Sequence, residues 1–435
     1  MTDDFVLAVL DATPSDAPPS HLTEQLVDQH AAVSRDLLGH DDFTGNGPDG
    51  VLRALQPGAS RHHWMVVGLS RLPDGLTGAS ETDTGLPLVP GRGAVEEGVR
   101  LLGSVHCGIP LQEDLDRMDL DLGVLPSERR RGVGSALQEA AEWIARAHGR
   151  AVLGTYSGHN RSAEPGSPEA LEAPTGAGTL DRTDAPCSFA LGHGYRLVQT
   201  EVHSQLDPAD GIARAETLEA DALAHARGYE VVTWGGRTPP EHVGGMVDLY
   251  RRMSTDVPHG DSEREEAVWS PKRVEENDVR REELGMRSVF AMARHTASGQ
   301  AVAYTYLTTP SRRPEACYQE DTLVAAEHRG HRLGTLVKVA ALRRAVAEWP
   351  QVRRIHTWNA GENAHMLAIN TALGFRPVSL EGVWEKRMGW ASPAARRPVA
   401  GASTSRRPRP GQAGRASSTQ KPLWRATRSQ VKEST

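Results

Sequence analysis

Cysteine is scarce in this chain of 435 residues, where only Cys107, Cys187 and Cys317 occur. They are widely separated and show no Cys-x-x-Cys or Cys/His ligand spacing, so neither a disulfide framework nor a zinc site is expected. Lysine is scarce as well, with 5 lysines against 44 arginines. We attribute this bias to a GC-rich genome rather than to a recognition task.

Long apolar runs are absent. No run approaches the ~20 residues that cross a bilayer, and residues 1–4 lack the basic and apolar regions of a signal peptide. We therefore expect a cytoplasmic protein with no membrane partner. Hydrophobic residues make up 38% of the chain, which is ample for packed cores, and the length favours two to four domains.

Positive charge is in deficit over most of the chain. Residues 1–390 carry a formal charge of −16, whereas residues 391–435 hold ten Arg or Lys and one acid. An acidic body does not suit nucleic-acid binding, so no specific nucleic-acid partner is expected. The basic end is rich in Ser, Thr, Pro and Ala, and residues 393–435 are predicted to be a disordered tail.

A strand, a basic turn and a helix follow one another in the last third of the chain. The strand is predicted over Glu320–Ala325, the turn over His328–Gly334 and the helix over Thr335–Trp349. The turn surrounds the beginning of the helix, where free backbone N–H groups and the positive end of the helix dipole favour an anion. A phosphate-bearing ligand would suit this turn.

The residues of the turn are compatible with a pyrophosphate. Arg329 and Arg332 add positive charge, and Gly330 and Gly334 let the backbone approach a phosphate closely. By itself, such a turn is more often a plain surface turn. The strand and the short helix ending in Gly-Phe that follow it favour the phosphate interpretation.

This order of elements resembles the GNAT acetyltransferase superfamily. In that family the turn reads Arg/Gln-x-x-Gly-x-Gly/Ala and holds the pyrophosphate of acetyl-CoA. Arg329 and Gly334 match the pattern, and Arg332 replaces its middle glycine. The resemblance implies an acetyl-CoA site formed by Leu323, Val324, Ala325, Arg329, Gly330, Arg332, Gly334, Asn359 and Asn363.

The roles within this implied site differ. Backbone N–H groups at Leu323, Val324 and Ala325 would hold the pantetheine and polarise the thioester carbonyl. Asn359 and Asn363 would position pantetheine amides, although helix capping alone would explain Asn363.

The same pattern occurs earlier in the chain. Arg129, Gly132 and Gly134 fit Arg-x-x-Gly-x-Gly, and the first and last of them lie 200 positions before their counterparts. A helix of similar length and a strand follow in both places, which indicates an internal repeat. The resemblance adds Val124, Arg129, Gly132 and Gly134 to the implied acetyl-CoA-binding residues.

We therefore expect an α/β (α+β) protein with two tandem GNAT-like domains, each a mixed, mostly antiparallel sheet flanked by helices. The predicted boundaries are 1–208 for the N-terminal domain, 209–228 for a helical linker and 229–392 for the C-terminal domain. A Gly/Ser/Pro-rich insert at 157–186 is predicted to be flexible. Because this insert interrupts the first copy, the second copy is expected to be catalytic.

Acetyl transfer to an amine requires a group that takes a proton from the amine, and Glu320 and Asp321 are the candidates. Successive side chains of a strand point to opposite faces, so only one of the two is expected to face the acceptor, and we favour Glu320. The alternative is that both are strand-edge carboxylates or partners of the neighbouring arginines.

The leaving thiolate also needs a proton. Many members of the family have a Tyr seven residues after the motif Asn, but counting from Asn363 gives Asn370, which has no titratable proton near neutrality. Asn370 is expected to hold the sulfur by a hydrogen bond, while water or Tyr318 supplies the proton. In the first copy, alignment of its Ala-Leu-Gly with that of the second puts Ser188 at this place.

The sequence thus predicts an acetyl-CoA-dependent N-acetyltransferase that acts on a primary amine of a small molecule or peptide and uses no metal. One alternative is a noncatalytic acyl-CoA-binding regulator, which the missing Tyr and Arg332 favour. Another is an enzyme that acetylates protein N-termini or lysines. The oligomeric state is not predicted.

Overall fold

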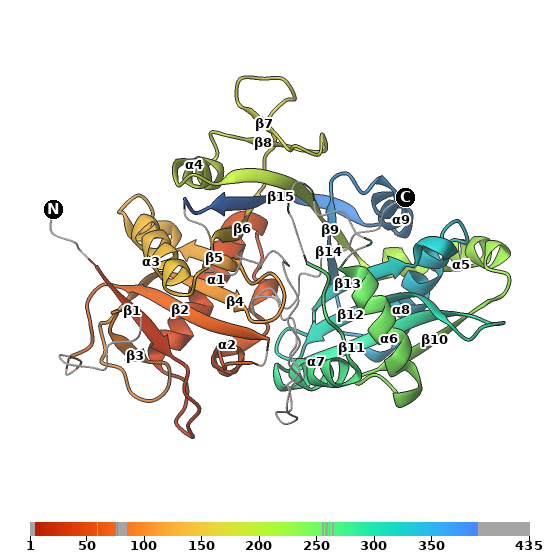
Figure 1. Ribbon diagram of the computed structural model, residues 1–435, viewed down its shortest axis with the longest axis horizontal. Coiled ribbons are helices and arrows are strands. Elements are labelled where there is room, and N and C mark those ends of the chain that lie inside the picture. The colour runs from red at the N-terminus through yellow and green to blue at the C-terminus, as the bar shows by residue number, and fades with distance from the viewer. Residues whose placement is uncertain are drawn as a thin grey trace, which may run out of the picture.

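The computed structural model describes residues 5–389 except residues 59, 75, 77–84, 255, 257–259, 261, 263 and 264. The predicted tail at 393–435 lies outside the described residues. Within the described part, one 13-stranded sheet runs through two units, with helices packed against it (Figure 1). None of the described helices is long and apolar enough to cross a membrane.

The first unit is an alternation of strands and helices. Its elements are β1 (Val6–Asp11), α1 (His21–Leu38), the 3₁₀ turn η1 (Asp42–Thr44), α2 (Gly47–Ala54), β2 (Arg61–Leu69), β3 (Leu88–Pro90), β4 (Leu101–Pro110), β5 (Arg117–Val124), the 3₁₀ turn η2 (Pro126–Glu128), α3 (Val133–Ala147), β6 (Val152–His159), β7 (Ala170–Glu172), β8 (Thr179–Asp181), α4 (Ala185–Gly192) and β9 (Arg196–Leu206).

The second unit repeats the order after one extra helix. Its elements are α5 (Pro208–His225), β10 (Tyr229–Gly235), α6 (Pro240–Met253), α7 (Pro271–Glu283), β11 (Met286–His295), β12 (Ala301–Pro310), β13 (Ala316–Val324), the 3₁₀ turn η3 (Ala326–His328), α8 (Leu333–Glu348), β14 (Arg354–Ala360), α9 (Ala364–Leu373) and β15 (Arg376–Arg387).

The two units are copies of one fold, as the sequence predicts. The run β5–η2–α3–β6 has its counterpart in β13–η3–α8–β14. The strand registers agree too, since Gly103 pairs with Val124 in the first unit and Ala303 pairs with Val324 in the second. The 200-position spacing of the turns therefore reflects a structural repeat.

The units exchange their last strands, which the sequence does not predict. In the sheet, β9 lies between β14 and β15, and β15 lies between β9 and β6. The last strand of the first unit, β9, thus pairs with β14 of the second unit, and the last strand of the second unit, β15, pairs with β6 of the first (Figure 1). A cut at the predicted boundary of 208 therefore does not divide the chain into two independent sheets.

Two segments between the repeated elements differ from the expectation. The insert predicted to be a flexible loop at 157–186 contains the end of β6, the paired strands β7 and β8, and the first residues of α4. The predicted linker at 209–228 is helical, but its helix α5 packs against α8 and α9. In particular, Ala215 and Ala222 of α5 are buried in the apolar core of the second unit.

Each unit has apolar cores on both faces of the sheet: α3 packs on one face and α1 and α2 on the other in the first unit, and α8 packs on one face and α6 and α7 on the other in the second. Helix α3 buries Val133, Leu137, Ala141, Ile144 and Ala145 at helical spacing. The helices α3 and α8 begin directly after the short turns that follow β5 and β13, the strands that part from β6 and β14.

Candidate functional site

The two predicted phosphate turns have the same backbone shape. In the second unit Gly330 and Arg332 have φ of 84° and 55°, and in the first unit Arg130 and Gly132 have φ of 64° and 87°. Left-handed backbone is costly for residues with a Cβ, yet each copy keeps an arginine in one of the two positions. Such strain is held in place by its surroundings and is frequent at ligand sites.

The turn of the second unit leads directly into α8. The first helical hydrogen bond runs from the Leu336 N–H to the Arg332 carbonyl, which leaves the preceding N–H groups at the helix start without an intrahelical acceptor. The Arg332 side chain forms an ion pair with Asp221 of α5. The positive charge of Arg332 is therefore partly neutralised by Asp221 and is not available only to a ligand in the turn.

The arginines at the start of the two turns differ in their contacts. Arg329 donates from Nε to the Val324 carbonyl at 3.3 Å. Arg129 donates to Asp36 of α1 at 2.7 Å. In the first unit the arginine of the motif is thus engaged by a carboxylate of an adjacent helix.

The central strands of each unit part beside these turns. β13 pairs with β14 over 316–318 only, and β5 pairs with β6 over 117–119 only. The Ala325 N–H donates to the Val302 carbonyl at 2.8 Å, so this predicted pantetheine donor is already used. Because successive N–H groups of a strand point to opposite edges, the Val324 N–H faces the side from which β14 has departed.

Glu320 and Asp321 lie on the same side of the sheet, and the expectation that they face opposite sides is wrong. The Thr308 hydroxyl donates to Glu320 at 2.7 Å, and the Tyr304 hydroxyl donates to Asp321 at 3.2 Å. The reason is a β-bulge: the register of β12 and β13 shifts so that both carboxylates lie opposite Tyr306 alone.

The surroundings of these carboxylates are aromatic and acidic. Burial raises the pKa of Tyr306 well above its usual value, and the nearby charges of Asp321 and Glu320 raise it further. Arg281 of α7 lies 5.7 Å from the Tyr306 ring centroid and forms an ion pair with Asp278. Asp278 and Glu320 act on this guanidinium, and Asp321 adds a third carboxylate near Tyr306, so the excess of negative charge favours a cationic guest.

The first unit has no counterpart of Glu320, and Asp119, two residues before Asp121, is bonded by Arg61 and Arg117. Its strands β4 and β5 pair without a bulge, with Cys107 opposite Leu120 and His106 opposite Asp121. An apolar Leu120 thus takes the place next to Asp121 that Glu320 takes next to Asp321.

Two of the three predicted asparagines are in contact with each other, and the third caps the start of α9. The Asn363 side chain accepts from the Met366 N–H at 3.1 Å, which makes it the N-cap, and Asn370 donates to Asn359 at 2.6 Å. Their remaining amide atoms, Nδ2 of Asn359 and Asn363 and Oδ1 of Asn370, are buried and have no hydrogen-bond partner among the described residues. Two donors and one acceptor fit the amides of a pantetheine arm.

The first-unit counterpart of Asn370 is Ala190, and the alignment that gives Ser188 is wrong. The Phe375 N–H donates to the Asn370 carbonyl, and the Tyr195 N–H donates to the Ala190 carbonyl, in the same helix-ending geometry. Gly374 and Gly194 both have positive φ at these ends. The helices therefore align through Gly-Phe and Gly-Tyr rather than through Ala-Leu-Gly.

Tyr318 does not serve as the alternative proton donor. It is 1% exposed and donates its hydroxyl to the Asp42 carbonyl at 2.6 Å. Burial and the nearby Asp42 raise its pKa well above the usual value. Its role is to join the units.

A network of buried polar groups surrounds this contact. Asp42 of η1 accepts two bonds of 2.6 Å from Arg354 and one of 2.9 Å from His356. Burial alone would raise the pKa of Asp42, but the bonds from Arg354 and His356 outweigh it and hold that pKa well below its usual range. Ligand atoms of His40, Asp42 and His356 lie within 4.8 Å of one another, which is close enough for a metal. Arg354 already supplies the positive charge there.

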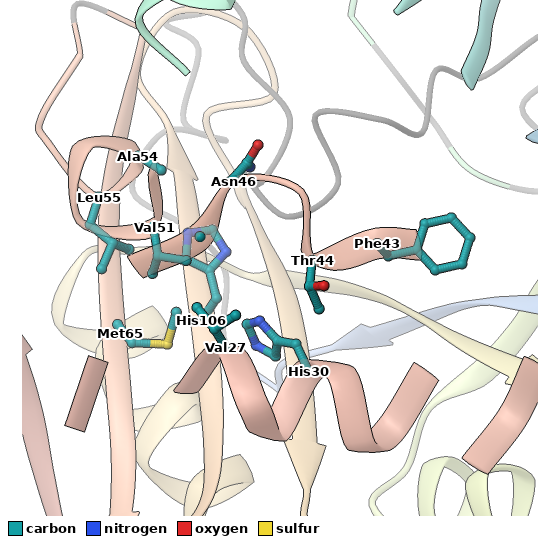
Figure 2. Close-up of a pocket in the computed structure, with 11 residues that line it drawn as sticks. Val27, His30, Phe43, Thr44, Asn46, Val51, Ala54, Leu55, Met65 and His106 are labelled. Atoms are coloured by element: carbon teal, nitrogen blue, oxygen red, sulfur yellow. The ribbon is translucent and has the colours of Figure 1, made fainter. Parts of the chain in front are cut away.

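A hollow of about 420 Å³, including its open mouth, lies in the first unit between α1, α2, β2 and β4 (Figure 2). His30, Asn46, Met65 and His106 are among the residues that line it, and the ring of Phe43 extends away from the others. None of the sequence-predicted site residues is among them. Burial lowers the pKa of His30 to about 4, so this imidazole is neutral at pH 7.

Comparisons with known proteins identify the fold. No family model matches the chain, and no curated protein matches it by sequence. Among solved structures, a tandem GNAT protein from the clavulanic acid biosynthesis pathway is 24% identical, with a TM-score of 0.62 over 89% of this chain and 99% of that one.

Two further structures are more distant. A GCN5-related N-acetyltransferase from Sphaerobacter thermophilus is 14% identical, with a TM-score of 0.51 over 90% of this chain and 98% of that one. A glucosamine N-acetyltransferase region of a fungal multi-domain β-N-acetylglucosaminidase is also 14% identical, with a TM-score of 0.51 over 88% of this chain and 38% of that one.

Proposed function

Because the chain has the fold of tandem GNAT proteins, we propose that it is an acetyl-CoA-dependent N-acetyltransferase whose second unit carries out the transfer. The observation that carries this proposal is the bulge that brings Glu320 and Asp321 to one face beside the parted strands. The first unit has the same opening with Leu120 in the place of Glu320. The proposed acceptor is a primary amine of a small molecule or peptide, and the proposed location is the cytoplasm, where acetyl-CoA is available.

The cofactor would lie along the opening between β13 and β14. The N–H groups at the start of α8, with Arg329 and Gly330, would hold its phosphates. The unpaired amide atoms of Asn359, Asn363 and Asn370 would bind the pantetheine arm. Bound acetyl-CoA supplies an activated thioester carbonyl, and the Val324 N–H faces the side where that carbonyl would lie.

The chain's own groups would handle the protons. Glu320, held by Thr308, would accept the proton that the amine loses as its nitrogen attacks the carbonyl. Asp321, held by Tyr304, would keep the face acidic and attract the cationic acceptor. The amine gains the acetyl group, the C–S bond breaks, and the thiolate takes a proton from water because Asn370 cannot supply one.

A noncatalytic acyl-CoA-binding regulator is the second candidate. The observation that favours it is Asn370, whose amide already donates to Asn359 and has no proton to give the leaving thiolate. The two candidates differ in turnover, since a regulator binds acetyl-CoA without consuming it.

The direct test is release of free CoA thiol from acetyl-CoA in the presence of a panel of amines, including peptides and intact proteins. Amine-dependent release, together with a product heavier by one acetyl group in mass spectrometry, supports the proposal. Binding of acetyl-CoA without release with any amine would favour the regulator. Acetylation of proteins alone would point to N-termini or lysines as acceptors.

A further inference from the structure

Three polar side chains of the first unit form a linear chain that the proposed transfer does not use. The Ser157 hydroxyl of β6 lies 2.6 Å from Nε2 of His159, and Nδ1 of His159 lies 2.7 Å from Oδ2 of Asp184. These are a hydroxyl, an imidazole and a carboxylate in the order found in serine hydrolases. Sequence reasoning missed them because they fall in the range predicted to be a flexible insert.

The direction of each hydrogen bond follows from the partners. Asp184 is a carboxylate and can only accept, so His159 donates from Nδ1. In a neutral imidazole Nε2 is then the acceptor, and Ser157 donates its hydroxyl proton to it. The indole of Trp384 donates to the Ser157 oxygen at 2.7 Å, which fixes that oxygen and stabilises negative charge on it. The hydroxyl is thus oriented to lose its proton to His159.

His159 is suited to act as a base. Its side chain is fully buried, and burial lowers its pKa although the hydrogen bond to Asp184 opposes this. The neutral form that can take a proton therefore prevails at pH 7. Asp184 also caps α4 by accepting from the Ala185 N–H with its other oxygen, Oδ1, which holds the carboxylate in place.

The neighbouring thiol is not a rival nucleophile. The sulfur of Cys187 lies 3.9 Å from Nε2 of His159, farther than the Ser157 oxygen. Burial raises the pKa of Cys187 to about 12, so almost no thiolate is present near neutral pH. Ser157 is half-buried, whereas Cys187 is fully buried.

Ser157 lies where an acyl group could reach it. It is three residues beyond Gly154, the last residue of β6 that pairs with β5, just as Asn359 is three residues beyond His356 in β14. Ser157 is therefore the first-unit counterpart of Asn359. Helix α4 also approaches the turn of this unit, because Phe189 lies 3.3 Å from where a Cβ of Gly134 would be.

We propose that Ser157, His159 and Asp184 form a second active site that accepts an acyl group from an activated ester or thioester and transfers it to water. The Ser157 oxygen attacks the carbonyl while His159 takes its proton, the C–S or C–O bond of the donor breaks, and the proton passes from His159 to the leaving group. Water then attacks the acetyl-serine with His159 again as base, releasing acetate and restoring Ser157. With acetyl-CoA the sum is acetyl-CoA plus water to acetate plus CoA.

The choice of acetyl-CoA as the acyl donor rests on the proposed function, but the triad of Ser157, His159 and Asp184 does not. Hydrolysis of p-nitrophenyl acetate therefore tests the triad independently. The full-length protein should release p-nitrophenol with an acetyl-enzyme visible in the intact mass after rapid acid quenching. Ser157→Ala should abolish the acetyl-enzyme and lower the rate by at least ~100-fold, and His159→Gln should do so comparably. Asp184→Asn, which keeps a capping residue, should lower the rate as well.

The matched control is Ser188→Ala. Ser188 is an exposed serine of α4 whose hydroxyl donates to the Arg182 carbonyl at 3.0 Å, and its loss should leave the rate unchanged. Ester hydrolysis without amine acetylation would refute the proposed function alone, and amine acetylation without acylation of Ser157 would refute this inference alone.

Labelling of the unaltered protein avoids any dependence on the variants' folding. A fluorophosphonate probe should modify Ser157, as peptide mapping would show, and acetyl-CoA should slow that labelling if it is a donor. Absence of label on Ser157, or p-nitrophenyl acetate hydrolysis that survives in folded Ser157→Ala, would overturn the proposal.

Discussion

At the scale of single residues, the account depends on which carboxylate takes the amine's proton. Glu320 must be ionised to act as a base, so the rate should rise with pH through the Glu320 pKa. Glu320→Gln should remove this ascending limb and lower kcat by ~100-fold or more. The control is Glu230→Gln, an exposed carboxylate that pairs with Arg294. An unchanged pH profile in Glu320→Gln would transfer the role to Asp321 or to water.

Asn370 gives a second prediction at this scale. Its amide can donate a hydrogen bond to sulfur as charge develops there, although it now donates to Asn359. Asn370→Ala should lower kcat by ~10 to 100-fold, about 1.4 to 2.7 kcal/mol of transition-state stabilisation. Steady-state kinetics with a thiol reagent measure this. Full activity in the folded variant would reduce Asn370 to a packing residue.

At the scale of elements, the turn before α8 is held in a strained conformation. Arg332 has φ of 55° where the first unit has Gly132. Arg332→Gly relieves the left-handed strain and loses only an exposed ion pair with Asp221, so the free energy of unfolding should stay level or rise by up to ~1 kcal/mol. Arg332→Val should lower it by ~1 kcal/mol or more. Urea titration distinguishes these outcomes, and equal stability of both variants would contradict the strain argument.

The elements also show what the sequence could and could not predict. The strand, basic turn and helix of each copy have local signals in Arg129, Gly134, Arg329 and Gly334, so their order is predictable. The bulge at Glu320 and Asp321 is not, because it depends on the register of β12 against β13 rather than on either strand alone. The hairpin of β7 and β8 could not be predicted either, because the Gly/Ser/Pro-rich composition of residues 157–186 is typical of loops.

At the scale of the whole molecule, the exchange of β9 and β15 makes the units interdependent. No local sequence signal distinguishes a strand that stays in its own unit from one that crosses, so tandem domains could be predicted and their shared sheet could not. The same holds for Asp42, which no local signal marks and which the structure places against Arg354 and His356.

This interdependence and the buried histidines give a prediction about pH. Burial lowers the pKa of His30 to about 4, and burial lowers that of His356 despite the opposing charge of Asp42. The unfolded chain therefore binds more protons than the folded one between the usual histidine pKa of ~6.5 and pH 4, and stability should fall as the pH drops through this window. In thermal unfolding, the melting temperature of His30→Gln should change less with pH over this window than that of the parent protein. An equal change with pH in both proteins would contradict the prediction.

The central claim is that the second unit carries out acetyl transfer, and charge reversal at the two matched turns tests it most directly. Arg129 and Arg329 occupy equivalent places before α3 and α8. Amine-dependent release of CoA thiol should fall by at least ~100-fold in Arg329→Glu, because a carboxylate at the helix start repels a phosphate. It should stay within a few-fold of the parent in Arg129→Glu. Equal loss in both folded variants, or loss in Arg129→Glu alone, would contradict the account.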